Sequence, residues 1–252
     1  LTAAFRRGPR MVKTINISHD GKNYTLQYPF TPLLETVVME ILSKNEYPPL
    51  PFLQGRQGAI LDIGANIGCV SLILSVYYPT ATIYAFEPSK DTFNFLRINT
   101  TALPNVRCFN YGLYNRDCAA KLYAGRDSSV TNSIGNSALN SSEFEMIQLR
   151  RASSFISDNG LDRILLLKID TEGAEVPLLL DIEHLLGNVD AIMLEYHSEQ
   201  DRLEIDRLLT ARFTLFSGKI PHAHRGNLVY VSKDVLATRT DVAWLAIPRP
   251  EL

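Results

Sequence analysis

From residue 58 onward, short apolar runs alternate with segments whose apolar residues recur at helical spacing. The apolar runs predict strands at residues 59–63, 82–86, 106–109, 164–169 and 191–196. The segments between and after them predict helices at residues 67–77, 90–101, 175–186 and 199–210. Strands that are separated by crossover helices form a parallel sheet with both faces covered. This part of the chain is therefore expected to be an α/β fold.

The C-terminal part of the chain follows a different pattern. Apolar residues at 213–216 and 228–231 are separated by a loop without helical periodicity. Two strands joined by a loop form an antiparallel pair. The pattern therefore predicts a sheet of about seven strands, mostly parallel, with an antiparallel C-terminal hairpin.

The N-terminal segment forms a separate predicted unit. Residues 12–28 alternate between polar and apolar around Asp20-Gly21, which indicates a hairpin. Thr31-Pro32 then starts a helix. Its apolar face consists of Leu33, Leu34, Val37, Val38 and Ile41. We predict an N-terminal appendage at residues 1–54 and the main domain at residues 55–252.

Composition narrows the possible functions. A chain of 252 residues suits one α/β domain with a small appendage. The formal charge of −2 gives no reason to expect nucleic acid as a partner. No apolar run reaches the roughly 18 residues of a membrane span. Cys69, Cys108 and Cys118 lack a zinc-like spacing, and Cys69 and Cys108 are expected to lie in the core. A reduced, cytoplasmic setting fits these cysteines.

A glycine-containing turn follows the first strand of the main domain. Gly64 and Gly68 are four residues apart, and Asn66 stands where a dinucleotide-binding turn has its second glycine. Such a turn suits a nucleoside cofactor without a pyrophosphate, such as S-adenosylmethionine. Asp62 is expected to serve the amino-acid end of that cofactor, directly or through water.

The next two strand ends complete the expected cofactor site. Glu87 closes the following strand, where a carboxylate accepts hydrogen bonds from ribose hydroxyls. Pro88 ends that strand, and Asn110 to Gly112 follow the third strand, where adenine would lie. The residues expected to contact the cofactor are Asp62, Gly64, Asn66, Gly68, Glu87, Pro88, Asn110, Gly112 and Asp170.

A second polar group lies at the ends of two later strands. Lys168 and Asp170 share one face of a strand, and Glu195 and His197 share a face of the next. Neighbouring strands run about 4.8 Å apart, so these side chains are expected to form one cluster at the carboxyl edge of the sheet. Lys168 stands in an apolar run and needs a partner, which we expect to be Asp170 or Glu195.

These motifs resemble the FkbM family of S-adenosylmethionine-dependent methyltransferases, over roughly residues 55–200. They are Ile-Leu-Asp-Ile-Gly-Ala-Asn-Ile-Gly at 60–68, Ala-Phe-Glu-Pro-Ser at 85–89, Leu-Leu-Lys-Ile-Asp-Thr-Glu-Gly-Ala-Glu at 166–175 and Met-Leu-Glu-Tyr-His at 193–197. The resemblance implies the class I methyltransferase fold, which is Rossmann-like. It also implies methyl transfer to a hydroxyl of a sugar or secondary metabolite. Residues 151–155 depart from the Thr-Leu-Asp-like stretch that is usual in the family.

An acceptor hydroxyl needs a base to remove its proton, and the sequence offers several. His197 is the first candidate because its ordinary pKa lies nearest neutrality. Asp170 is the second, and Lys168 could act only if burial lowered its pKa. Glu195 completes the expected catalytic set. The acceptor itself is expected to be a small molecule or a glycan.

Other interpretations of the same residues remain open. Glu172 and Glu175 can be first-turn acids that favour a helix dipole, and His197 can simply bridge the sheet edge to a loop. A divalent metal bound by Asp170, Glu195 and His197 is an alternative, although no tight ligand spacing demands one. His222 and His224, expected in a loop, could reach the cleft from its edge.

Three regions are expected to set the choice of acceptor. They are the N-terminal appendage, the loop at 217–226 and the loop at 125–145. The last of these follows a short strand at 119–123, and its Ser/Asn-rich part at 127–142 is expected to lie over the cleft. Two other functions stay possible from sequence: a nicotinamide-dependent oxidoreductase on a Rossmann sheet and a non-catalytic, methyltransferase-like binding module. A homodimer is also possible.

Overall fold

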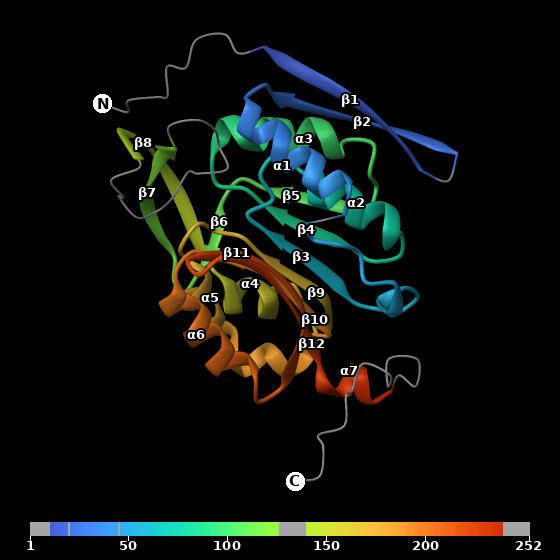
Figure 1. Cartoon of the computed structure of the whole chain (residues 1–252), viewed down its shortest axis with the longest axis vertical. Coiled ribbons are helices and arrows are strands. Elements are labelled where there is room, and N and C mark those ends of the chain that lie inside the picture. Colours follow the sequence, from blue (N-terminus) through green and yellow to red (C-terminus); the bar gives the residue numbers. More distant parts are fainter. Residues whose placement is uncertain (1–10, 20, 45, 126–139, 239–252) are drawn as a thin grey trace.

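A computed structural model describes residues 11–19, 21–44, 46–125 and 140–238 of the chain. Its centre is a sheet formed by β3 (Ala59–Ile63), β4 (Ile83–Phe86), β5 (Val106–Phe109), β9 (Ile164–Ile169), β10 (Ala191–Tyr196), β11 (Phe213–His222) and β12 (Arg225–Ser232). The strand order is β11-β12-β10-β9-β3-β4-β5 (Figure 1). Strand β12 runs opposite to the other strands of this sheet, so it is antiparallel to both β10 and β11. The predicted α/β fold, mostly parallel with an antiparallel C-terminal hairpin, is confirmed.

Helices cover both faces of this sheet (Figure 1). They are α2 (Cys69–Tyr77), α3 (Lys90–Thr100), α4 (Ala152–Asp158), α5 (Glu175–Ile182), α6 (Glu199–Leu209) and α7 (Lys233–Ala237), with 3-10 turns η1 (Pro51–Leu53) and η3 (Glu183–Asn188). One apolar core lies between the sheet and α2, and a second lies between the sheet and α4, α5 and α6. Cys69 is buried in the first core, as predicted, and Tyr196 is fully buried in the second. Cys108 is only partly buried. Among the described residues, no helix is long and apolar enough to cross a bilayer.

The N-terminal segment forms the predicted hairpin and helix. Strands β1 (Val12–His19) and β2 (Lys22–Pro29) pair antiparallel, and α1 (Pro32–Leu42) follows. Thr31 caps α1 by accepting a hydrogen bond from the Leu34 amide at 3.1 Å. The Asn99 side chain on α3 bonds both the amide and the carbonyl of Gln27. Residues of β2 and α1 also share the apolar core with α2, so the appendage packs directly on the main sheet's helical layer.

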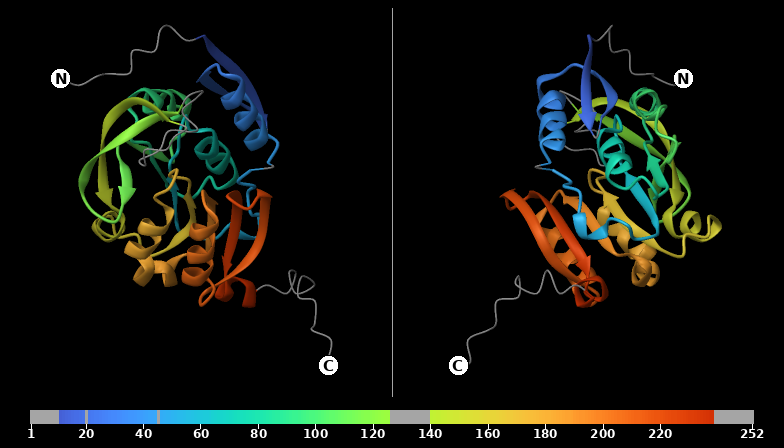
Figure 2. Two further views of the ribbon diagram at one scale, coloured as in Figure 1. Left: turned by 60° about the vertical axis from the view of Figure 1, so that its left-hand side comes forward. Right: turned by 90° about the vertical axis from the view of Figure 1, so that its right-hand side faces the viewer.

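The structure corrects the prediction for residues 112–160. Strands β6 (Gly112–Tyr114), β7 (Cys118–Gly125) and β8 (Asn140–Arg151) form a three-stranded sheet of order β6-β8-β7, where only a short strand at 119–123 was expected. Its inner positions Ile147 and Leu149 alternate with polar residues, but the exposed Met146 interrupts this pattern. The predicted loop at 127–142 lies outside the described residues, except that 140–142 begin β8. Two further views show this small sheet on a different side of the molecule from the C-terminal hairpin (Figure 2).

The C-terminal hairpin is longer than predicted. Strand β11 extends to His222 and β12 starts at Arg225, so most of the expected loop at 217–226 is paired strand. Strand β11 lies at the edge of the sheet, and nearly all its residues after Phe213 are exposed or half-buried. An edge strand with so little burial lacks the apolar alternation that identifies strands in a sequence.

Candidate active site

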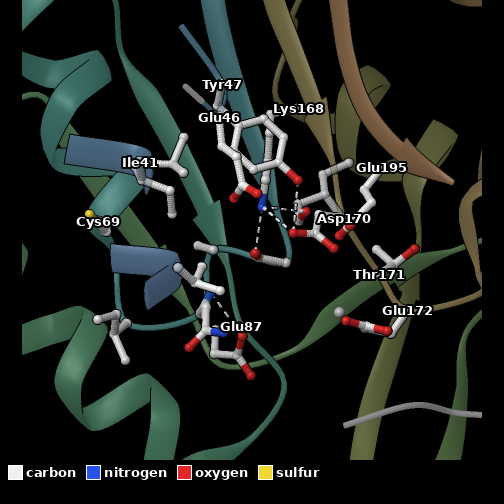
Figure 3. A pocket seen from close by; sticks show the side chains of 18 of the residues that line it. Ile41, Glu46, Tyr47, Cys69, Glu87, Lys168, Asp170, Thr171, Glu172 and Glu195 are labelled. Atoms are coloured by element: carbon white, nitrogen blue, oxygen red, sulfur yellow. Dashed lines mark hydrogen bonds and ion pairs between the residues drawn. The ribbon is translucent and has the colours of Figure 1, made fainter. Parts of the chain in front are cut away.

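A cavity of about 370 Å³ opens at the carboxyl edge of the main sheet (Figure 3). Helix α1 forms an apolar wall on one side, and the chain segments that follow the sheet strands form the polar side. The predicted residues that line it are Gly64, Asn66, Glu87, Pro88, Gly112, Lys168, Asp170 and Glu195. The structure thus brings most of both predicted groups to one edge. The predicted residues outside its lining are Asp62, Gly68, Asn110 and His197.

The two glycines of the first turn have different structural roles. Gly64 has φ of 78°, and a Cβ there would lie 1.8 Å from the Asp170 carbonyl oxygen. It therefore allows the ends of β3 and β9 to approach at the cavity. Gly68 has φ of 87°, and a Cβ there would lie 2.8 Å from Cδ1 of Leu96. Gly68 thus allows α2 to pack against α3, which differs from its expected contact with a cofactor.

Glu87 presents a carboxylate to the cavity from the end of β4. Its oxygens accept hydrogen bonds from the amides of Asn66 at 3.0 Å and Ser89 at 2.9 Å. Burial raises the pKa of Glu87 to about 7, although these two amides act to lower it. Asn110 does not face the cavity, because its side-chain amide bonds the carbonyls of Glu87 and Pro88 at 3.0 and 3.1 Å. It fixes the turn instead of reaching the expected adenine position.

Lys168 and Asp62 form a buried pair beneath the cavity. The two residues are register partners on β9 and β3, and Nζ of Lys168 lies 3.2 Å from Oδ1 of Asp62. Asp62 is fully buried and also accepts a hydrogen bond from Ser71 at 2.6 Å, so its carboxylate does not face the expected cofactor position. Lys168 donates to the Gly64 carbonyl at 2.6 Å. Asp62 is therefore a partner of Lys168 that the sequence analysis missed.

Of the two expected partners of Lys168, only Asp170 is near. Its Oδ2 lies 3.8 Å from Nζ, whereas Glu195 makes no ion pair with Lys168. Burial acts to lower the pKa of Lys168, but Asp62 and Asp170 raise it above its ordinary value. Lys168 therefore carries a positive charge and is not a base at neutral pH.

Asp170 is the titratable carboxylate at the centre of the site. Its side chain is 25% exposed, and burial raises its pKa to about 7 against the opposing effect of Lys168. Its Oδ2 accepts a hydrogen bond from the Tyr47 hydroxyl at 2.9 Å. Burial raises the pKa of Tyr47 well above its ordinary value, so its hydroxyl keeps its proton. Figure 3 shows Tyr47 and Lys168 converging on Asp170, with Glu87 apart from them.

Tyr47 was missed by the sequence analysis, which placed it in the N-terminal appendage without a role in the site. It is buried, and its φ of 49° lies in the left-handed region that residues other than glycine rarely adopt. Backbone strain of this kind concentrates at functional sites. Tyr47 and Asp170 are 123 positions apart in the sequence, so the local sequence pattern gives no sign that they are in contact.

His197 lies among three carboxylates outside the cavity lining. Its ring nitrogens are 3.1 Å from Glu172, 3.3 Å from Glu175 and 3.6 Å from Glu195. Burial acts to lower the pKa of His197, but these carboxylates raise it far above its ordinary value. An imidazolium has no lone pair with which to accept a proton. His197 is thus not suited to be the general base, and its geometry fits the alternative role of bridging the sheet edge to a loop.

The Asp-Thr-Glu-Gly-Ala-Glu motif forms a tight turn closed by its last residue. Glu175 is fully buried, and its carboxylate accepts hydrogen bonds from the amide and hydroxyl of Thr171, both at 3.0 Å. The Gly173 amide donates to the same carboxylate at 3.1 Å. Glu172 and Gly173 both have positive φ. Glu175 therefore shapes the turn that presents Asp170 and Glu172, although it also stands in the first turn of α5.

Arg225, at the start of β12, is a site residue that the sequence analysis placed in a loop. Its guanidinium binds Glu195 in a bidentate pair at 2.5 and 3.0 Å and reaches Glu172 at 3.3 Å. Burial acts to raise the pKa of Glu195, but His197 and Arg225 lower it to about 2, so Glu195 stays ionised. His222 and His224 are exposed and do not line the cavity.

Four potential metal-binding side chains lie close together at this edge. Ligand atoms of Asp170, Glu172, Glu195 and His197 are within 4.8 Å of one another. His197 and Arg225 already form ion pairs with Glu172 and Glu195, and Lys168 lies near Asp170. Because its own side chains supply the cations, we do not assign these residues as metal ligands.

Several known proteins with similar sequences are named methyltransferases. Methyltransferase 1 of Beauveria bassiana is 29% identical over 62% of this chain and 72% of its own length. The hexuronic acid methyltransferase AglP of Haloferax volcanii is 25% identical over 59% of this chain and 60% of its own. The 2-O-methyltransferase NoeI of Sinorhizobium fredii is 24% identical over 59% of this chain and 67% of its own length. The alignments thus span only part of each relative.

A solved structure shares the fold, and the sequence shows the family. A fibrillarin from Methanococcus jannaschii has a similar fold, with a TM-score of 0.50 over 92% of this chain and 87% of that one, at 9% identity. Residues 62–216, more than half of the chain, match the model of the methyltransferase FkbM domain. This range contains both strand-end groups that form the cavity. The chain is therefore an enzyme of the FkbM methyltransferase family.

Proposed function

We propose that this enzyme transfers a methyl group from S-adenosylmethionine to a hydroxyl of a sugar or secondary metabolite. The observation that carries the proposal is that Glu87 and Asp170, from strands on either side of β3, line the same cavity. The carboxylate of Glu87 suits hydrogen bonding to a ribose, and the carboxylate of Asp170 suits the role of proton acceptor. The printed names of two relatives, a hexuronic acid methyltransferase and a 2-O-methyltransferase, support a sugar-like acceptor.

The residues at the β3 and β4 ends suit the cofactor. Each oxygen of Glu87 has one amide donor, which leaves a second lone pair on each for a ribose hydroxyl. Gly112 and the apolar residues Leu113, Leu122 and Leu149 line the neighbouring wall, where an adenine ring could be buried. When bound, S-adenosylmethionine supplies a sulfonium methyl group for in-line displacement by the acceptor oxygen.

Asp170 is the general base of this proposal. Its pKa of about 7 matches the requirement that a general base be partly deprotonated near neutral pH. Tyr47 binds one carboxylate oxygen, which leaves the other for the acceptor hydroxyl. Asp170 would accept the proton that the acceptor hydroxyl loses during this displacement. Alignment of the reacting atoms in the cavity supplies several kcal/mol of the barrier reduction.

Lys168 assists without reacting. Its charge lies between the Asp62 carboxylate and the Gly64 carbonyl, and it lowers the pKa that burial alone would give Asp170. It therefore holds the β3 turn and keeps the base from being permanently protonated.

Calorimetry with S-adenosylhomocysteine and with NAD tests the cofactor. We expect S-adenosylhomocysteine to bind and NAD to bind weakly or not at all, because Asn66 replaces the glycine that admits a pyrophosphate. Tighter binding of NAD would overturn the proposal. Transfer of labelled methyl groups to a panel of hydroxyl compounds then separates an active enzyme from a binding module, with Asp170→Asn as the inactive control.

A further inference from the structure

Glu46 is a cavity residue that the proposed reaction does not use. It precedes Tyr47 and is half-buried in the cavity wall. Within the part of the chain that the structure describes, its carboxylate makes no hydrogen bond or ion pair. The charges that act on it most strongly belong to Glu195, Lys219, Glu40 and Arg225. Glu46 therefore lines the same cavity as Asp170, and Glu195 is the charged group that acts on it most strongly.

Acidic groups dominate the charge of this cavity. Among the described residues, its lining includes the carboxylates of Glu46, Glu87, Asp170, Glu172 and Glu195 but only two cationic side chains, Lys168 and Arg225. Both of these cations already have carboxylate partners: Asp62 for Lys168, and Glu195 and Glu172 for Arg225. An acceptor with a carboxylate or phosphate beside its reacting hydroxyl would therefore meet repulsion without a free cation to offset it.

An apolar surface faces these acids across the cavity. Leu33, Val37 and Ile41 of α1 line that side, and Leu33 and Val37 are not fully buried by protein. A ring with one apolar face could lie on α1 while its substituents point toward Asp170 and Glu46. The site thus combines an apolar wall with a carboxylate, that of Glu46, that has no partner among the residues that the structure describes.

We propose that the acceptor is a hydroxyl compound with an ammonium group near the reacting hydroxyl, and that Glu46 binds this ammonium. This inference rests on the proposed methyl transfer and specifies its substrate class as amino sugars or amino alcohols, with uronic acids excluded. Burial and Glu195 raise the pKa of Glu46, and an ammonium beside it would lower that pKa again, favouring the charged pair.

Three matched probes test this assignment without knowledge of the natural acceptor. They are vicinal aminocyclohexanol, cyclohexanediol and hydroxycyclohexanecarboxylate, which differ only in the group beside the hydroxyl. Binding of each to the full chain saturated with S-adenosylhomocysteine is measured by calorimetry or by NMR. We expect the amine to bind best and the carboxylate worst. In Glu46→Gln, the affinity for the amine should fall roughly tenfold, as for loss of a charged hydrogen bond, with little change for the diol.

Glu40→Gln is the matched control. Glu40 lies in α1, six residues before Glu46 and outside the cavity lining, and pairs with Lys219 at 2.7 Å. The Glu40→Gln substitution also removes one negative charge near Glu46. Because Glu40 does not line the cavity, we expect the preference for the amine to stay nearly unchanged. An equal loss in both variants would mean a general field effect and would overturn direct binding by Glu46.

The outcomes also separate this inference from the proposed function. If S-adenosylhomocysteine does not bind, the proposed methyl transfer fails first. If it binds but the carboxylate probe equals or exceeds the amine, or none of the three probes binds, the acceptor assignment alone is wrong.

Discussion

The Tyr47 hydroxyl donates a hydrogen bond of 2.9 Å to Oδ2 of Asp170, which joins the segment after α1 to the carboxyl end of β9. Because burial keeps Tyr47 protonated, this donor is present over the whole working pH range. A donor that favours the ionised carboxylate lowers its pKa. Tyr47 therefore both orients the proposed base and limits the rise in its pKa that burial causes.

Replacement of Tyr47 by Phe should raise the pKa of Asp170 above about 7. Loss of a hydrogen bond to a charged group, about 1.5 kcal/mol, corresponds to roughly one pKa unit. The ionised base is the active form, so the acidic limb of the pH–rate profile should move to higher pH. Carboxylate NMR of Asp170 measures the same shift without an acceptor.

Tyr78→Phe is the control for this substitution. Tyr78 is also buried, but its hydroxyl bonds only the backbone of Leu50 and lies outside the cavity lining. It should reduce stability without moving the pKa of Asp170. A Tyr47→Phe variant with an unchanged Asp170 titration would show that the hydrogen bond has no influence on the base.

Glu87→Ala should weaken the binding of S-adenosylhomocysteine by about 2 kcal/mol, or roughly 30-fold, because two charge-assisted hydrogen bonds to the ribose are lost. The pKa of Glu87 is raised to about 7, so wild-type affinity should also fall as the pH drops below this value and the carboxylate becomes protonated. Calorimetry across pH checks both effects. An affinity that is insensitive to both the substitution and pH would contradict the ribose role.

His197→Gln should cost roughly 3 kcal/mol of stability, because it leaves Glu172, Glu175 and Glu195 close together without their shared cation. The folded-state pKa of His197 is raised above its ordinary value of 6.5. Its stabilising contribution is therefore complete below that pH and declines as the pH rises toward the folded-state pKa. The cost of the substitution should be larger in acid than in alkali, as measured by urea unfolding.

The same variant separates a structural His197 from a catalytic one. If His197 were the base, His197→Gln would abolish methyl transfer at temperatures where the protein is fully folded. We expect folded His197→Gln to keep substantial turnover, whereas Asp170→Asn should lose at least 10²-fold, as for removal of a general base.

Gly64→Ala should prevent normal folding of the site, because the new Cβ would lie 1.8 Å from the Asp170 carbonyl oxygen. Gly160→Ala is the matched control, since Gly160 also has positive φ but has nothing within 4 Å of its Cβ position. The control should cost about 1 kcal/mol for the backbone conformation alone. Thermal unfolding should show a much larger loss for Gly64→Ala, and equal losses would rule out the close approach of β3 and β9.

The sequence by itself determined the elements of the main sheet and the edge at which the site forms. Buried parallel strands are continuous apolar runs, so β3, β9 and β10 stand out along the chain. The carboxyl ends of parallel strands meet at one edge, which is why motifs at 62–68, 87 and 168–170 could be assigned to one site before any distance was known. Strands β8 and β11 were missed or shortened because exposed residues interrupt their apolar pattern.

Only the tertiary structure decided which of these polar residues can react. The pairing of Asp62 with Lys168, the three acids around His197 and the contact of Tyr47 with Asp170 all join different elements. A pKa depends on burial and on charges within a few ångströms, and neither is a property of local sequence. For that reason the sequence ranked His197 above Asp170 as the base, and the opposite order that we propose depends on the folded geometry.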